Sequence, residues 1–257
     1  MGRTFVLGDI HGCDKALRTM LECIAPATDD TLIFLGDYID RGPDSRGVVS
    51  QLIDLRQFTR TIFLRGNHEV MLCGVMDRGC DDKLWLRNGG QATVNSYGGS
   101  LTKIPDAHRQ FFRDLRSYHE GDEFICVHAH YDPTTPMHLQ TDQELYWRHL
   151  SDAPPAPHVS GKTVFLGHTP QASGQVLNCG YLVCLDTYCF GGGYLSAMCI
   201  DDETILQTNR HGHLRSTPLS RLTSWIRNGW NQLGNRFNRS PDDEPQNRAV
   251  GSPHHLP

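Results

Sequence analysis

Three short glycine-containing segments carry the residues of this sequence that are best suited to chemistry. They are Gly8-Asp-Ile-His-Gly12, Gly36-Asp-Tyr-Ile-Asp-Arg-Gly42 and Gly66-Asn-His-Glu69. Carboxylate and amide oxygens combined with imidazole nitrogens, without thiolates, suit hard or borderline divalent metal ions. Histidine and aspartate also act as acid and base, and arginine binds phosphate oxygens. A single segment of this kind is commonly a solvated turn, so the occurrence of three is what favours a metal-dependent site.

Each of these segments follows a short apolar run that has the length of a buried strand. The runs begin at Arg3, Thr31 and Thr61 and are too short to be helices. Between them, apolar residues recur at helical spacing in residues 16–24 and 48–53. The resulting β-α-β-α-β order makes the three strands parallel neighbours, so their carboxyl ends and the three segments meet at one edge of a sheet.

Two further apolar runs each lead into a histidine. Residues 123–127 precede His128, and residues 162–166 precede His168. A lone histidine after a strand is usually structural. Two of them, downstream of three segments that carry metal-ligand residue types, favour metal binding instead.

The three segments, in this order, resemble the motifs of the metal-dependent phosphoprotein phosphatases, which belong to the calcineurin-like metallophosphoesterases. Because Trp85-Leu-Arg-Asn-Gly-Gly90 follows them and no long additional domain does, the chain is most similar to the compact bacterial and phage-type serine/threonine phosphatases. The resemblance covers roughly the first four fifths of the chain. It implies an α/β fold in which two mixed β-sheets form a sandwich flanked by helices, with the later strands making up the second sheet.

The resemblance also implies two divalent metal ions, with manganese favoured and iron or zinc as alternatives. The implied ligands are Asp9, His11 and Asp37 for one ion, and Asp37, Asn67, His128 and His168 for the other. Asp37 would then bridge the two ions, and a metal-bridging hydroxide would attack phosphorus directly.

The remaining site residues are also assigned by resemblance. His68 would protonate the leaving oxygen while Asp40 fixes its tautomer, and Arg41 and Arg148 would bind the phosphate. Arg148 ends Glu144-Leu-Tyr-Trp-Arg148, where a surface ion pair is the alternative role.

Four residues near these motifs, Asn67, Trp85, Asn88 and His130, have roles that the motifs alone do not fix. Asn67 and Asn88 are candidate substrate contacts, although Asn88 fits a turn equally well, and Trp85 is expected to be a buried anchor. The family commonly has glycine two positions after the first ligand histidine, but this chain has His130. Substrate preference therefore does not transfer directly from the family.

The expected activity is hydrolysis of phosphoserine and phosphothreonine in proteins, extending to phosphotyrosine and small aryl esters. One alternative is hydrolysis of dinucleoside polyphosphates such as diadenosine tetraphosphate, since a related branch uses the same metal segments. A second alternative is a non-catalytic regulatory protein. That class is expected to have lost a metal ligand, whereas all six ligand positions are filled here.

Composition narrows the class of protein further. The net charge of -5 over 257 residues gives no basic footprint, so we expect no nucleic-acid partner. No apolar run approaches the roughly 18 residues that a membrane-spanning helix needs. The nine cysteines are odd in number and contain no C-x-x-C pair, which predicts reduced thiols in a cytoplasmic protein. Cys13 lies beside the first metal segment.

The chain is expected to comprise a catalytic domain over residues 1–212, with a helical insertion between residues 82 and 118. Short strands from residue 175 onward are expected to form hairpins. Residues 213–240 predict an amphipathic helix that packs on the domain or contacts a partner or a membrane surface. Residues 241–257 are expected to be disordered because they are poor in apolar residues.

Overall fold

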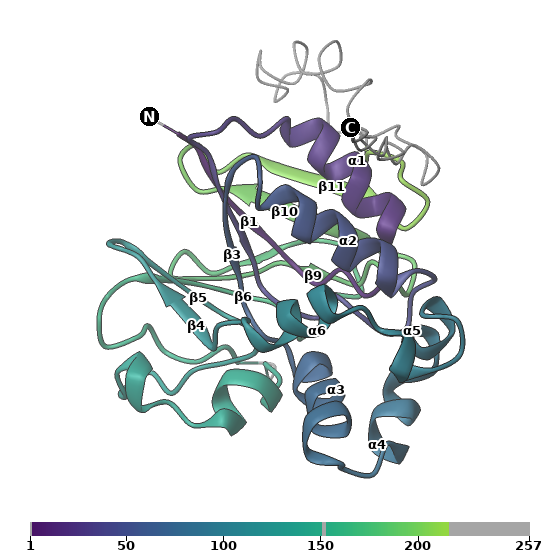
Figure 1. The fold of residues 1–257 in the computed structure, drawn as a ribbon. Helices are drawn as coiled ribbons and strands as arrows, with labels where there is room; N and C mark the ends of the chain where they lie inside the picture. The colour runs from purple at the N-terminus through teal and green to yellow at the C-terminus, as the bar shows by residue number, and fades with distance from the viewer. Residues whose placement is uncertain (1, 151–152, 216–257) are drawn as a thin grey trace, which may run out of the picture.

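Two β-sheets packed face to face form the centre of the protein (Figure 1), as seen in a computed structural model that describes residues 2–150 and 153–215. The first sheet has the strand order β11 (Ile205–Asn209), β10 (Tyr194–Cys199), β1 (Thr4–Leu7), β2 (Thr31–Phe34) and β3 (Arg60–Phe63), and β9 (Asp186–Thr187) pairs with β10. The second has the order β4 (Tyr118–Glu120), β5 (Phe124–Val127), β6 (Thr163–Leu166), β8 (Leu182–Cys184) and β7 (Leu177–Asn178). The predicted α/β sandwich is therefore confirmed.

The arrangement of the strands matches the sequence prediction in the first half of the chain but differs from it in the second half. β1, β2 and β3 are parallel, as the β-α-β-α-β order requires. The expectation that all later strands form the second sheet is wrong, because β9, β10 and β11 belong to the first sheet. β10 runs antiparallel to β1 and covers what would otherwise be an open edge, which satisfies the backbone groups there.

Alternating residues divide each strand between two apolar layers. Phe5 and Leu7 of β1 face the helices, whereas Val6 packs between the sheets with Ile33 of β2 and Phe165 of β6. The helices are α1 (Asp14–Ile24), α2 (Ser45–Leu55), α3 (Asn67–Arg78), α4 (Lys83–Trp85), α5 (Gln91–Ser96) and α6 (Asp106–Arg113), with short π-helical turns at Leu86–Gly90 and Gln143–Trp147. Figure 1 shows α1 and α2 lying across the first sheet.

The predicted insertion between residues 82 and 118 is helical and includes α4, α5 and α6. The nine cysteines are all free thiols, as expected. None of the helices in the described part of the chain is apolar over a stretch long enough to cross a bilayer. The predicted amphipathic helix lies outside the described residues from position 216 onward, as does the predicted disordered tail.

Candidate metal centre and active site

The loops that follow β1, β2, β3, β5 and β6 converge at one end of the sandwich and bury their polar side chains. Asp9, Asp37 and Asn67 come from the first sheet, and His128 and His168 come from the second. Several of these loops are strained, since the backbone φ of His11, Asp37, Asp40, Arg41 and His168 is positive. Gly66 is required beside Asp37, because an added Cβ there would lie 2.0 Å from Asp37 Oδ1.

Asp37 lies at the centre of the site, between two groups of histidines. Its Oδ2 is 3.4 Å from His11 Nε2 and 3.9 Å from His68 Nε2, and its Oδ1 is 3.4 Å from His128 Nε2. Among the residues that the structure describes, two sets of side chains have ligand atoms close enough to hold an ion, His11-Asp37-His68 and Asp37-His128-His168. Asp37 belongs to both sets, which is the arrangement a bridging ligand needs.

Three histidines each turn an unprotonated nitrogen towards the site because the other ring nitrogen is bound to a backbone carbonyl. His11 Nδ1 donates to Ile39 O at 2.9 Å and His128 Nδ1 donates to Leu35 O at 2.9 Å. His168 Nε2 donates to Trp147 O at 3.2 Å. Since a carbonyl only accepts, these bonds fix the tautomers, as is usual for metal-bound histidines.

The protonation states of these histidines also suit metal binding. Burial lowers the pKa of His168 to about 3, and it likewise lowers the pKa of His11 and of His128. Their lone pairs are therefore available. Asn67 Oδ1 lies 3.1 Å from His128 Nε2 and 3.0 Å from His168 Nδ1, so three acceptor atoms face one another without a hydrogen between them. A cation satisfies such a group.

Asp9 adds a second carboxylate to the site. It accepts a hydrogen bond from the His168 backbone N–H at 3.0 Å. Burial raises the pKa of Asp9 well above its ordinary value, and the charges of Asp186 and Asp37 raise it further. A carboxylate crowded by two others in a buried site is stabilised by a divalent cation, so the donor set fits the two ions expected from the sequence.

His68 differs from the three ligand histidines in its partner and its charge. Its Nδ1 donates to Asp40 Oδ2 at 2.6 Å, and its Nε2 is buried with no hydrogen-bond partner among the described residues. Burial alone would lower the pKa of His68, but the charge of Asp37 and the bond to Asp40 outweigh burial and raise it. The structure therefore favours a proton on His68.

Asp40 is itself held by two side chains from the helical insertion. Trp85 Nε1 donates to Asp40 Oδ2 at 2.7 Å, and Thr93 Oγ1 donates to Asp40 Oδ1 at 2.5 Å. The expectation that Trp85 is buried is confirmed, since only 1% of it is exposed. Its contact with Asp40 was not foreseen, although a buried indole N–H usually finds an acceptor.

Arg41 reaches the metal centre, and Asn88 lies next to it. Arg41 NH1 is 3.1 Å from His11 Nε2, and its guanidinium lies over the Phe190 ring at 4.6 Å. The backbone carbonyl of Asn88 accepts from Arg41 Nε at 3.4 Å. The Asn88 side chain donates to Leu84 O at 2.9 Å, so here it stabilises the helix turn.

Arg148 is exposed and forms an ion pair with Glu144, the alternative role that the sequence left open, and Glu144 also binds His130. Arg148 NH1 donates to Glu144 Oε1 at 2.8 Å, and His130 Nδ1 donates to Glu144 Oε2 at 2.9 Å. Arg148 follows Trp147, whose carbonyl binds His168, so the chain itself brings it close to the metal centre. His149, which the sequence did not single out, stacks on His168 with ring centroids 4.2 Å apart.

The comparison with families and relatives agrees with this geometry. The family model described as "Calcineurin-like phosphoesterase" matches residues 2–193. A segment of 87 residues is 44% identical to "Serine/threonine-protein phosphatase 1" of Salmonella typhimurium, and covers 34% of this chain and 38% of that protein. "Bis(5'-nucleosyl)-tetraphosphatase, symmetrical" of Cellvibrio japonicus is 27% identical over 267 residues, which cover 79% of this chain and 97% of that protein.

Solved structures with the same fold include a protein described as "a putative diadenosine tetraphosphatase". It is 23% identical and superimposes with a TM-score of 0.62, covering 80% of this chain and 93% of the other. A cold-active protein tyrosine phosphatase, 14% identical, superimposes with a TM-score of 0.61 over 84% of this chain and 78% of the other. At these identities the likeness concerns the fold alone.

Proposed function

The chain belongs to the calcineurin-like phosphoesterase family, and we propose that it is a dinuclear-metal phosphomonoesterase acting on phosphoserine and phosphothreonine in proteins. The observation that carries this proposal is the division of the four central histidines. Three are neutral and aim a lone pair into the site, whereas His68 is held by Asp40 with its pKa raised. A metal site with a separate acid suits an ester whose leaving group needs a proton.

The proposed ligand assignment keeps the group Asp37-His128-His168, but in the other group it replaces His68 by Asp9, because His68 is held by Asp40. One ion would be held by Asp9, His11 and Asp37, and the other by Asp37, Asn67, His128 and His168. Manganese is the proposed metal, with iron or zinc as alternatives, because the donors are oxygen and imidazole nitrogen. When bound, the ions would supply an activated water and positive charge next to the phosphate.

The protein's own side chains account for the rest of the reaction. His68 holds a proton at Nε2, the unpartnered atom, and would give it to the leaving oxygen. Asp40 keeps the His68 ring in place through Nδ1. Arg41 would bind phosphate oxygens beside His11. Glu144 holds one nitrogen of Arg148 and leaves the others free for the phosphate.

A second candidate activity is hydrolysis of dinucleoside tetraphosphates. It is supported by the alignment with the Cellvibrio japonicus protein, which spans nearly the whole of that relative. We favour the monoester because a phosphate leaving group has a much lower pKa than a serine alkoxide. A buried acid such as His68 therefore helps the serine ester more.

A metal-reconstituted substrate panel tests this choice. The full chain is chelated, reloaded with manganese, iron or zinc, and assayed on phosphoserine and phosphothreonine peptides, diadenosine tetraphosphate and an aryl phosphate. The proposal predicts a higher kcat/KM on at least one phosphopeptide than on diadenosine tetraphosphate. The reverse order would favour the second candidate, and no turnover of any substrate with any metal would overturn both.

A further inference from the structure

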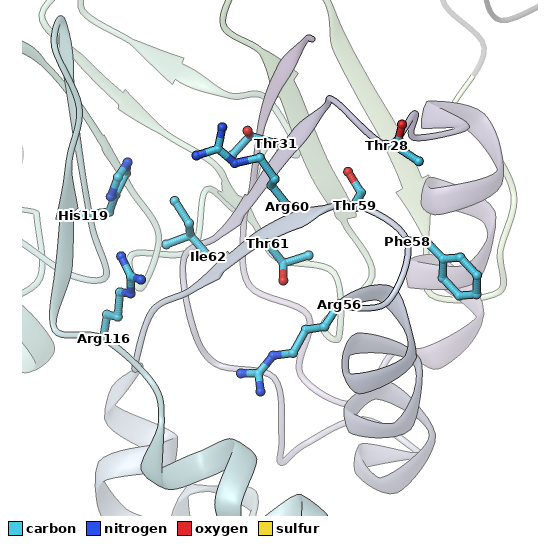
Figure 2. A pocket seen from close by; sticks show the side chains of 10 residues that line it. All are labelled: Thr28, Thr31, Arg56, Phe58, Thr59, Arg60, Thr61, Ile62, Arg116 and His119. Carbon is cyan, nitrogen blue, oxygen red and sulfur yellow. The ribbon is translucent and has the colours of Figure 1, made fainter.

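An open surface pocket of about 650 Å³ lies at the opposite end of β3 from the metal centre. Its walls come from the loop before β2, the end of α2, the first residues of β3, and the segment that leads into β4 (Figure 2). The lining residues are Thr28, Thr31, Arg56, Phe58, Thr59, Arg60, Thr61, Ile62, Arg116 and His119. The volume lies within the range of about 300–1,000 Å³ that is typical of small-molecule sites.

The lining of this pocket is basic and contains no carboxylate. Neither Arg60 nor Arg116 has an acidic side chain within ion-pair distance in the part of the chain that the structure describes. Arg56 is 4.0 Å from Asp114, and both side chains are largely exposed, so that contact is weak. This basic pocket occurs on a chain whose net charge is -5.

Unpaired arginines are not the rule at this end of the sheet. Arg3, at the start of β1, donates to Asp30 at 2.5, 3.2 and 3.3 Å through its side chain. In the basic pocket, burial and repulsion by the positive charge of Arg116 lower the pKa of His119. An anion in the pocket would relieve this repulsion.

The positions of the side chains suit an anion that contacts several donors. Figure 2 shows Arg60 and Ile62 on the side of β3 that faces the segment carrying Arg116 and His119, with Ile62 between the two arginines. The hydroxyl of Thr31 lies next to Arg60 in the same view. Guanidinium groups and hydroxyls in this arrangement are the donors that phosphate oxygens use.

We propose that the basic pocket binds the phosphate groups of a small ligand of about nucleotide size, with Arg60 and Arg116 as the principal contacts. The competing explanation is that the arginines only keep β3, an edge strand, from pairing with other chains. Protection of an edge strand requires charged side chains but no bound ligand. Binding of phosphate at the pocket would therefore distinguish the two explanations. The proposal does not depend on the reaction at the metal centre.

Calorimetric titration of the metal-loaded full chain tests the proposal, with three probes that resist hydrolysis. Methylenediphosphonate carries the phosphate-like groups alone, α,β-methylene-ADP adds a nucleoside, and adenosine lacks phosphate. The variants are Arg60→Ala/Arg116→Ala for the pocket, Arg41→Ala for the metal centre, and Arg18→Ala as a matched control, since Arg18 is exposed on α1 outside both sites.

We expect two classes of binding for the phosphonate probes and none for adenosine. The double variant should lose one class, with affinity falling about tenfold for each guanidinium removed, and turnover should stay at the wild-type level. Arg41→Ala should weaken the other class of binding, and Arg18→Ala should weaken neither class.

Tighter binding of α,β-methylene-ADP than of methylenediphosphonate would identify the ligand as a nucleotide. Equal binding of the two probes would identify it as a diphosphate group. If the double variant unfolds, Arg60→Gln provides the same test with about a tenfold loss. Unchanged phosphonate binding in a folded pocket variant would overturn the proposal.

Discussion

The two ends of β3 present polar side chains in opposite ways. At the carboxyl end, Asn67 and His68 are buried, and the bond to Asp40 fixes the orientation of the His68 ring. At the amino end, Arg60 is exposed and lines the basic pocket without an ion-pair partner among the described residues. One short strand of four residues thus connects a pre-organised site to an open one.

The difference shows what fixing a site requires. Around the metal centre, Glu69 accepts backbone N–H groups from Asp37, Tyr38 and Gly66 at 2.9 to 3.0 Å, so one buried carboxylate ties two strand-end loops together. Such networks hold strained backbone in place. In the basic pocket, Thr59 is held by the carbonyls of Ala27 and Asp30. Arg60 and Arg116 have no ion pair among the described residues, so their charges can adjust to a ligand. Changes at the carboxyl end should therefore affect turnover, and changes at the amino end should not.

The largest loss is expected for Asp37→Asn. This change removes charge from the ligand shared by both groups, so bound metal and turnover should fall together, with kcat reduced about 10³-fold or more. Metal content by elemental analysis and kcat on a phosphopeptide measure the two effects. Asp54→Asn, an exposed position on α2, is the control and should change neither. Two bound ions and near wild-type turnover in Asp37→Asn would rule out the bridging role.

His68→Asn separates proton transfer from metal binding. We expect both ions to stay bound while kcat on alkyl phosphates falls roughly 10²- to 10⁴-fold, the range for a positioned acid. An aryl phosphate should lose less, because its leaving group has a lower pKa and needs the proton less. Asp40→Asn should show the same dependence more weakly. Equal losses on both esters, or loss of metal in His68→Asn, would remove His68 from the acid role.

Trp85→Phe should have a smaller effect of the same kind. It keeps the packing but deletes the N–H that Asp40 accepts, so kcat on alkyl phosphates should fall about tenfold with KM little changed. The loss should again be smaller on aryl phosphates, which a purely structural change would not produce. Tyr97→Phe is the matched control, because that buried phenol bonds to His108 instead.

The smallest effect concerns stability at the amino end of the sheet. The bonds from Arg3 outweigh burial and hold the pKa of Asp30 below its ordinary value, so the pair stabilises the folded state above that value and stops doing so as pH falls through the lowered pKa. Asp30→Asn should therefore cost about 1 kcal/mol of unfolding free energy at pH 7, and the difference from wild type should shrink in acid. Urea denaturation of wild type and variant at pH 7 and at acidic pH measures this difference in unfolding free energy. Arg60→Ala should cost nothing at either pH, and a pH-independent effect of Asp30→Asn would contradict the pairing.

The fold was predictable where its signals are local. Each of the first three strands is a contiguous apolar run followed by a helix, and this order fixes their parallel arrangement. The partition of the later strands was not predictable in this way. β10 pairs with β1 although the two strands are far apart in the sequence. No residue in either strand indicates which strand it will pair with.

The same distinction applies to the site. The proposed metal ligands follow short apolar runs that a reader of the sequence can find. The structure groups Asp37 with His11 and with His128 and His168. It also brings Asn67 against the last two and Asp9 against the His168 backbone. Trp85 and Thr93 act on Asp40 from 45 and 53 residues away, so only the folded chain reveals them. The stacking of His149 on His168 is likewise visible only in the folded chain.

The most direct test of the account is to locate the metal ions around Asp37. Crystals of the full chain soaked in manganese, with anomalous diffraction data, should show two peaks that share Asp37. One should lie against Asp9 and His11, and the other against Asn67, His128 and His168, with His68 contacting neither. A single peak, or a peak bound by His68 Nε2, would contradict the separation of metal ligands from the acid on which the proposed function rests.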